Sequence, residues 1–250
     1  MKRIFINGIA GQMGRAIQSL EDDSFSIVGG VDVSEAKQIA PVFKTVQDIN
    51  VDFDVVIDVS VPKASMAMLE YCVTNRKPIV ICTTGFSSAE EQKILEAAEL
   101  IPVFRSANMS LGINIQAEIC KAIAKTLGGA ADIEIIEKHH KRKLDAPSGT
   151  ALMLFDELNE ARNGQLRAEF GRDRSHGRRE ENEVGVHAVR GGSVVGEHEI
   201  LFLMDDEVIS VTHQAFSRRV FATGAVKAAK FIASKPAGFY AMKDLIAESR

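Results

Sequence analysis

The sequence predicts an α/β fold that combines a doubly wound parallel sheet with a second, mixed or antiparallel sheet. Three observations support this prediction. Short apolar runs alternate with helical segments over roughly the first hundred residues, which indicates a parallel sheet. A glycine-rich turn follows the first of these runs directly. After residue 183, strand-like segments follow one another without helices between them, which indicates an antiparallel or mixed sheet.

The chain has 250 residues, of which 46% are apolar, enough for one large or two small domains with a real core. A net charge of −4 gives no overall basic field, so we expect no nucleic-acid partner. No apolar run approaches the ~20 residues that a membrane span needs, and no signal peptide precedes the first strand. We therefore expect a cytoplasmic protein with no membrane partner.

The three cysteines, Cys72, Cys82 and Cys120, are scattered and odd in number. They fit buried thiols in a reducing compartment better than disulfides. The sequence has no Cys-x-x-Cys pair and no regular spacing of histidine and cysteine, so we expect no metal site.

The glycine-rich turn stands between a first strand over 4–6 and a helix over about 12–20. Its spacing, G-x-x-G-x-x-G, is a variant of the dinucleotide fingerprint, in which glycines allow the tight turn and the close approach of a pyrophosphate. A second strand over 26–31 ends in an acid, where the adenosine ribose hydroxyls bind. These features predict a Rossmann-type dinucleotide-binding domain; the alternative is a glycine turn without a ligand. The predicted cofactor contacts here are Gly8, Ile9, Ala10, Gly11, Gln12, Met13 and Asp32.

Further strands are predicted over 53–59, 78–82 and 102–105, and helices over 63–74 and from Ser87 onward. Ser87 and Glu90 form the Ser-x-x-Glu pattern of a capping box. Ligands of doubly wound sheets bind at the carboxyl ends of the strands, so the residues after these strands are expected to face the cofactor.

The alternation of helices and strands stops after Asn108. A long helix is predicted over 111–127, a buried strand over 133–136 and a mobile surface loop over 161–182. The remaining segments are predicted as strands over 184–189, 194–204 and 208–215, with a hairpin-like turn at Asp205-Asp206, and as a helix over 217–235.

The stretch 134–151, E-I-I-E-K-H-H-K-R-K-L-D-A-P-S-G-T-A, gathers groups suited to a small dianionic ligand. Basic residues fill 138–143 after the predicted strand, a segment called the basic turn below. Ser148 or Asp145 can cap the following helix, whose first N–H groups can bind an anion. The alternative is a solvated basic loop before an ordinary helix start. Two adjacent histidines, a nearby lysine and the helix N-terminus favour a ligand site.

The pattern H-H-x-x-K followed by D-A-P-S-G-T-A resembles the signature of the 4-hydroxy-tetrahydrodipicolinate reductase (dihydrodipicolinate reductase) family of lysine and diaminopimelate biosynthesis. The resemblance implies an NAD(P)H-dependent oxidoreductase that reduces a cyclic imine dicarboxylate with overall loss of water. It implies that His139 is the catalytic acid/base, that Lys143 is the proton donor, and that His140, Gly149 and Thr150 bind the substrate. The residues by themselves do not separate the roles of the two histidines.

The same resemblance implies cofactor contacts at two later strand ends, namely Cys82, Thr83, Thr84, Ser106, Ala107, Asn108 and Met109. The family usually has glycine at the position of Cys82. The resemblance also implies that the second domain is inserted. Residues 1–107 and 223–250 would then bind the dinucleotide, and 108–222 would serve substrate binding and oligomerisation, with a homotetramer as the expected assembly.

Cofactor choice is predicted from Asp32 and the residues after it. The negative charge of Asp32 would repel the 2′-phosphate of NADPH. Proteins that bind NADPH usually offset this repulsion with an arginine directly after the acid. Here Val33, Ser34 and Glu35 follow, and the nearest cation further along the chain is Lys37. We therefore predict that NADH is preferred and that NADPH is used less well.

Two other functions stay open at this stage. One is a different Rossmann oxidoreductase, such as a homoserine-type or semialdehyde dehydrogenase. A semialdehyde dehydrogenase needs a cysteine nucleophile, and no cysteine lies near the basic turn. The other is a non-catalytic NAD-sensing protein, which would not need an H-H-x-x-K turn beside a helix start.

Overall fold

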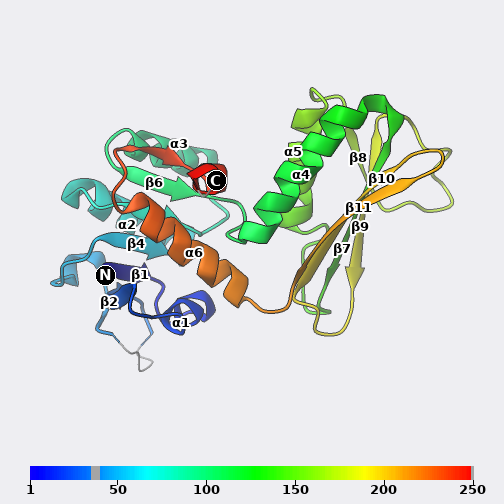
Figure 1. Cartoon of the computed structure of the whole chain (residues 1–250). Helices are drawn as coiled ribbons and strands as arrows, with labels where there is room; N and C mark the ends of the chain where they lie inside the picture. Colours follow the sequence, from blue (N-terminus) through cyan, green and yellow to red (C-terminus); the bar gives the residue numbers. More distant parts are fainter. Residues whose placement is uncertain (35–39, 249–250) are drawn as a thin grey trace. The chain divides into compact units, whose positions relative to one another are not determined.

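The computed structural model describes residues 1–34 and 40–248 and divides the chain into two compact units. The first unit consists of Met1–Leu111 and Arg218–Arg250, and the second of Gly112–Ser217 (Figure 1). Each unit has its own sheet and its own buried core, so the two are described separately.

The first unit contains a seven-stranded sheet in which every neighbouring pair is parallel. The strand order is β12-β6-β5-β4-β1-β2-β3. The bounds are β1 Lys2–Asn7, β2 Phe25–Val31, β3 Val42–Phe43, β4 Val55–Asp58, β5 Ile79–Ile81, β6 Pro102–Arg105 and β12 Gly238–Tyr240. The order reverses between β1 and β4, and ligands of such sheets bind beyond the carboxyl ends of the strands at this point.

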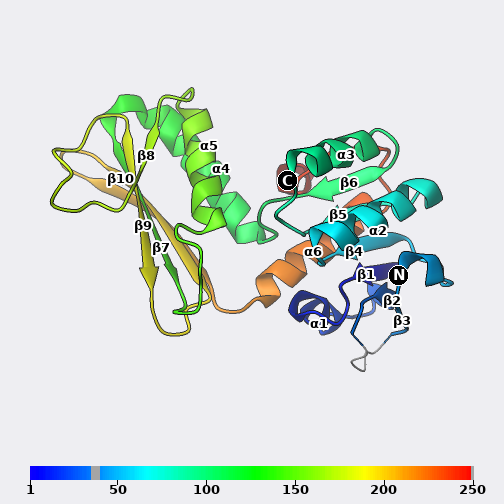
Figure 2. The same ribbon diagram turned by 180° about the vertical axis from the view of Figure 1, so that it is seen from behind.

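Helices cover both faces of this sheet (Figures 1 and 2). Their bounds are α1 Gln12–Gln18, α2 Pro62–Asn75, α3 Ser88–Ala98, α6 Arg219–Ile232 and α7 Met242–Glu248. α1, α6 and α7 pack on one face, and α2 and α3 pack on the other. Along β1 the side chains alternate between the two cores, with Ile4 and Ile6 in the first and Phe5 in the second. The predicted doubly wound parallel sheet is confirmed.

The predicted capping box at the start of α3 is also confirmed. The Ser87 side chain accepts a hydrogen bond from the Glu90 N–H, and the Glu90 carboxylate accepts one from the Ser87 N–H at 2.8 Å. α2 begins one residue earlier than expected, because Pro62 occupies the first turn, where its missing N–H costs no helical hydrogen bond.

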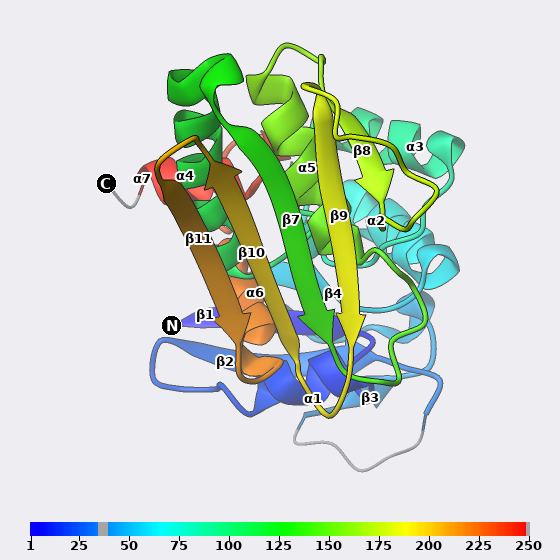
Figure 3. The same cartoon turned by 90° about the vertical axis from the view of Figure 1, so that its right-hand side faces the viewer.

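The second unit contains a five-stranded mixed sheet in the order β11-β10-β7-β9-β8. β10 pairs antiparallel with β7 and β11, and β9 pairs parallel with β7 and β8. The strands are β7 Asp132–His139, β8 Arg167–Phe170, β9 Glu183–Arg190, β10 Gly196–Leu203 and β11 Val208–Ala215. The helices α4 (Leu111–Leu127) and α5 (Gly149–Ala161) pack on one face. Figure 3 looks onto the opposite face, which no helix of the described residues crosses.

The strand β7 is longer than the sequence predicted, since it continues past Ile136 to His139. Its buried positions alternate along the strand and end with Glu137 and His139, both on the side that faces the helices. The sequence analysis ended the strand at Ile136 because it followed apolar runs, and the two inward positions after Ile136 carry polar residues. His139 is therefore the last residue of the strand and does not belong to the loop after it.

The segment 161–182, expected to be only a surface loop, contains the edge strand β8. The sequence R-A-E-F gives no apolar run, and the strand forms because it pairs with β9. The short β3, β12 and α7 were not predicted either. Within the described ranges, no helix has the length and apolar character to cross a membrane.

Candidate active site

A cavity of about 350 Å³ lies at the carboxyl ends of β4, β5 and β6 in the first unit. It is lined by all the contacts predicted from the two later strand ends, together with Met13 from the glycine-rich turn: Cys82, Thr83, Thr84, Ser106, Ala107, Asn108 and Met109. The segment 59–62 and Phe221 complete the lining. Phe221 was not predicted, whereas 59–62, at the end of the predicted strand 53–59, was expected to face the cofactor without its residues being named individually.

A second cavity, of about 540 Å³, surrounds the glycine-rich turn. Gly8, Gly11 and Asp32 line it, as do the segment 44–47 and Ala64. The two cavities share the residues 59–61, so they adjoin along the carboxyl edge of the sheet. Two adjoining cavities at this edge fit the two halves of a dinucleotide.

The glycines of the turn are required by their geometry. Gly8 has a φ of +87°, and an added Cβ would lie 2.8 Å from the carbonyl oxygen of Val59. At Gly14 an added Cβ would lie 2.4 Å from the carbonyl oxygen of Gly8, so α1 packs directly against the turn. A side chain at either position would displace the backbone that borders the second cavity. The turn therefore fits the role of a pyrophosphate cradle.

Three of the predicted cofactor residues line neither cavity. Ile9 is buried in the core, and Gln12 is exposed at the start of α1. Ala10 donates its N–H to one carboxylate oxygen of Asp32 at 2.9 Å, and Ser34 donates its N–H to the other at 2.9 Å. These two bonds orient Asp32, which lines the second cavity.

Lys44 is a basic neighbour of Asp32 that was not predicted from the sequence. The N–H of Asp32 donates to the carbonyl oxygen of Phe43 at 3.0 Å, and this pairing brings Lys44, at the end of β3, beside Asp32. Lys44 lines the same cavity as Asp32. Glu35 and Lys37, on which the predicted cofactor preference partly depended, lie outside the described residues.

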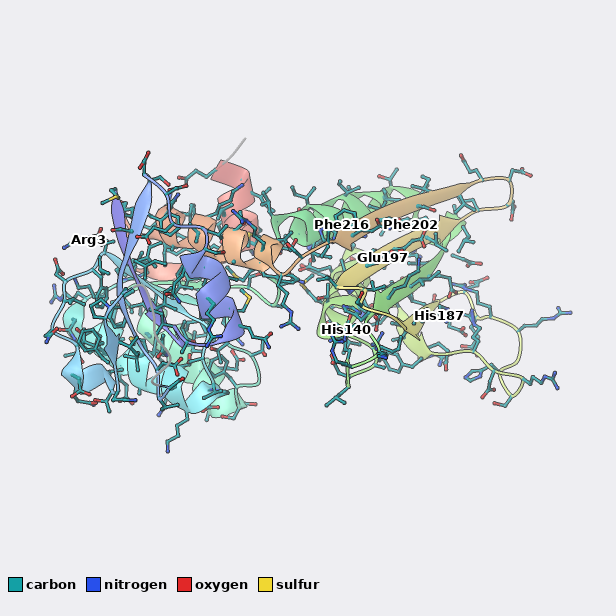
Figure 4. All side chains as sticks on the ribbon, turned by 90° about the horizontal axis from the view of Figure 1, so that it is seen from below. Arg3, His140, His187, Glu197, Phe202 and Phe216 are labelled. Atoms are coloured by element: carbon teal, nitrogen blue, oxygen red, sulfur yellow. The ribbon has the colours of Figure 1, made fainter. Side chains whose placement is uncertain are left out.

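The basic turn of the second unit begins at the end of β7. His139 is the last residue of the strand and is 9% exposed. His140 follows it and is labelled in Figure 4. Gly191 donates its N–H to the carbonyl oxygen of His139 at 2.9 Å, and Lys143 donates its N–H to that of His140 at 3.1 Å. The Lys143 ammonium lies 2.9 Å from the Asp145 carboxylate and keeps the pKa of that carboxyl below its ordinary value.

Glu137 is a fully buried carboxylate at this turn, and the sequence analysis did not identify it. It lies 2.6 Å from Nδ1 of His139 and accepts two hydrogen bonds from Arg190, at 2.6 and 2.7 Å. It also accepts the N–H of Ser148 at 3.0 Å. Burial acts to raise the pKa of Glu137, but the hydrogen bonds from His139 and Arg190 outweigh it and hold the pKa at about 2. The carboxylate is therefore ionised.

The helix α5 begins at Gly149, after the segment 144–148 that follows the basic turn. Ser148, one of the two predicted caps, is the cap residue, and its hydroxyl accepts the N–H of Ala151 at 3.2 Å. Gly149 and Thr150 are the first helical residues. An added Cβ on Gly149 would meet nothing within 4 Å, so there is open space at this helix N-terminus. Such a position suits a carboxylate ligand.

A buried histidine supports the same cluster. His198 on β10 forms a hydrogen bond with the Ser148 hydroxyl at 3.1 Å, and its ring meets that of His139 edge-on with centroids 5.2 Å apart. Burial and then the nearby His139 lower the pKa of His198 to about 3, so its ring is neutral. His198 therefore helps to hold Ser148 and His139 in place through these two contacts.

Taken unit by unit, the fold and its sites define a class of protein. The first unit has a parallel sheet, a glycine cradle, an acid at the end of β2 and two adjoining cavities. The second unit contains two histidines, a lysine and a helix N-terminus, groups whose charge and donors suit an anionic ligand. This is the arrangement of a dinucleotide-dependent oxidoreductase.

Family models narrow the class further. The model for the dihydrodipicolinate reductase N-terminus matches residues 2–109, and that for the dihydrodipicolinate reductase C-terminus matches residues 112–246. The protein therefore belongs to the dihydrodipicolinate reductase family.

Individual relatives agree with this assignment. The chain is 44% identical over 245 residues to the 4-hydroxy-tetrahydrodipicolinate reductase of Clostridium tetani, covering 97% of this chain and 96% of the relative. It is also 44% identical over 248 residues to the reductase of the same name from Caldanaerobacter subterraneus, covering 98% of each. A solved dipicolinate-bound dihydrodipicolinate reductase from Paenisporosarcina sp. TG-14 shares the fold, with a TM-score of 0.77 and 23% identity over 96% of this chain and 97% of that one.

Proposed function

We propose that the protein catalyses the NAD(P)H-dependent reduction of 4-hydroxy-tetrahydrodipicolinate, via dihydrodipicolinate, to tetrahydrodipicolinate and water in lysine and diaminopimelate biosynthesis. The observation that carries this proposal is the basic turn with His139, His140 and Lys143, whose strand β7 is tied to the N-terminus of α5 by the hydrogen bond from the Ser148 N–H to Glu137. The relatives with 44% identity over nearly the whole chain, which bear the name of this activity, support it.

The proposed substrate is a small ring with two carboxylates. Gly149 and Thr150 would bind one carboxylate through the first N–H groups of α5 and a hydroxyl, and His140 would be a further substrate contact. A bound nicotinamide supplies the hydride. The protein's own task is to hold the ring and deliver a proton to it, with His139 as acid/base and Lys143 as proton donor.

The test is an assay of NADH oxidation by the purified protein with freshly generated dihydrodipicolinate. We expect NADH to be consumed only when this compound is present. A homoserine-type dehydrogenase would instead consume NADH with an acyclic aldehyde, and an NAD-sensing protein would bind NADH without turnover. Either of these results would contradict the proposal.

Thr150→Val should raise the KM for the substrate about tenfold or more and leave NADH affinity unchanged. The reason is the loss of a hydrogen bond to a charged carboxylate, which costs about 1.5–3 kcal/mol. The matched control is Thr126→Val, because Thr126 is an exposed threonine whose hydroxyl donates to the Ala122 carbonyl within α4. If Thr150→Val leaves the KM unchanged, the carboxylate binds elsewhere.

NADH should give a higher kcat/KM than NADPH, with both cofactors active. Asp32 would face the adenosine ribose and repel a 2′-phosphate, while Lys44 beside it would offset part of the repulsion. Val33→Arg should therefore shift the ratio toward NADPH, and Lys44→Ala should shift it toward NADH. The ratios are compared at one moderate ionic strength because salt screens these charges. A native preference for NADPH of about tenfold or more would contradict the assignment of Asp32.

We also propose that the protein is a cytoplasmic homotetramer that assembles through the second unit. The edge strand β11 is exposed along most of its length, and its exposed side chains include Val208 and Ile209 on opposite faces of the sheet. An exposed edge strand with apolar side chains can pair with another chain. Light scattering of the purified protein tests this assembly, and a monomer mass at all concentrations would contradict it.

A further inference from the structure

We infer that Glu137 is the positioning residue of this active site: one buried carboxylate, paired with Arg190, fixes both His139 and the substrate-binding start of α5. The inference rests on the proposed function, because it assigns a role to a side chain beside the proposed acid/base. Neither the resemblance to the family nor the sequence pattern singled out Glu137 or Arg190.

The first part of the role concerns His139. The ionised Glu137 is a pure acceptor, so the 2.6 Å contact requires the proton of the imidazole to be on Nδ1. This sets the tautomer in which Nε2 is the atom that exchanges a proton with a substrate. Gly196 on β10 keeps room at that atom, since an added Cβ there would lie 3.1 Å from Nε2.

The second part concerns the carboxylate site. The other oxygen of Glu137 accepts the N–H of Ser148 at 3.0 Å, and Ser148 is the cap residue of α5. Gly149 and Thr150, the proposed carboxylate ligands, follow at once. One carboxyl group therefore links the proposed proton-transfer residue and the proposed carboxylate site, with one oxygen for each.

Arg190 completes the unit from β9. Its guanidinium binds both oxygens of Glu137 and also donates to the carbonyl oxygen of Asp145 at 2.7 Å, in the segment between Lys143 and Ser148. The pairing of β7 with β9 places Arg190 opposite His139. A planar guanidinium with several donors can hold a carboxylate and a loop carbonyl at once, which an ammonium cannot do in the same geometry.

The charge of Glu137 also bears on proton transfer. The ionised carboxylate of Glu137 lies 2.6 Å from the ring that would transfer the proton, so it attracts positive charge on that ring at short range. Other charged or titratable groups surround Glu137 and His139. They come from β9, β10, β11 and the segment 143–145: Arg190, His198, His213, Lys143 and Asp145. Glu137 is the buried carboxylate that contacts the His139 ring directly.

The test compares Glu137→Gln and Glu137→Asp with the native protein in the dihydrodipicolinate assay. We expect Glu137→Gln to lower kcat roughly 10- to 100-fold, to raise the KM for the substrate, and to leave NADH binding unchanged. In ¹⁵N NMR spectra the His139 ring should lose its preference for the tautomer with the proton on Nδ1, because a glutamine side chain can donate as well as accept. Glu137→Asp keeps a carboxylate but shortens its reach, so it should lower kcat less than Glu137→Gln and keep that tautomer.

The matched control is Glu134→Gln, which removes a charge from the opposite face of β7 and should change neither kcat nor the His139 tautomer. Native kcat with the native tautomer in Glu137→Gln would overturn the inference, as would lost activity with the native tautomer. If Glu137→Gln does not fold, Arg190→Lys serves instead, with a raised KM expected and a native KM as the contradicting result. Failure of the proposed function is distinguishable, because the native protein would then be inactive in the same assay.

Discussion

His139→Ala should lower kcat by roughly 10²–10⁴-fold and leave NADH binding almost unchanged. The variant removes the proposed acid/base at the end of β7, while both cavities proposed for the cofactor belong to the first unit. Lys143→Ala should have an effect on the same scale, because its ammonium is the proposed proton donor. Steady-state turnover at saturating NADH and a titration of NADH binding measure the two effects separately.

The two residues should also behave as one unit. The double variant should lose less activity than the product of the two single effects, since either loss already interrupts the proton transfer. The control is Lys141→Ala, an exposed lysine of the same turn, for which kcat should stay near the native value. A double variant with near-native turnover would remove the mechanism assigned to this turn.

Gly224→Ala should destabilise the protein by about 1–3 kcal/mol or more and weaken NADH binding. An added Cβ on Gly224 in α6 would lie 1.7 Å from the carbonyl oxygen of Met109. Either α6 moves off the sheet or the loop 106–109 moves, and Met109 and Asn108 in that loop line the first cavity. Thermal unfolding and NADH titration measure the two consequences.

The expected change in the free energy of unfolding has the opposite sign from the change that the sequence alone suggests. Alanine is favoured over glycine by about 0.8–1.0 kcal/mol in a helix interior, so propensity predicts that Gly224→Ala stabilises α6. The control is Gly129→Ala, where an added Cβ meets nothing within 4 Å and the effect on stability should be small. If the Gly224→Ala protein is as stable as the native one, the loop 106–109 moves without loss of stability and the prediction is wrong.

The sequence by itself determined the features that arise within short segments. The G-x-x-G-x-x-G turn requires glycine for reasons local to the turn: Gly8 has a φ of +87°, and an added Cβ on Gly14 would lie 2.4 Å from the carbonyl oxygen of Gly8. The capping box of Ser87 and the cap at Ser148 depend on residues three apart, so they were predictable as well. The alternation of apolar runs and helices is likewise local, and it was enough to predict the doubly wound sheet.

The cofactor part of the candidate site could also be predicted, from the positions of the strands and the rule that ligands bind at the carboxyl ends of parallel strands. Because the carboxyl ends of parallel strands share one edge, Thr83 and Asn108 could be expected near each other, and both line the first cavity. The roles of His139 and Lys143 came from a family resemblance, because residue types alone do not distinguish one histidine of an adjacent pair from the other.

Only the tertiary structure decided which distant segments meet. Glu137 and Arg190 are 53 residues apart, and the parallel register of β7 and β9 brings them into contact. In the same way, the pairing of β2 with β3 brings Lys44 beside Asp32, and β8 forms only because β9 is there to pair with it. The physical reason is that strand register depends on the packing of the whole sheet, whereas periodicity and turn chemistry act over a few residues.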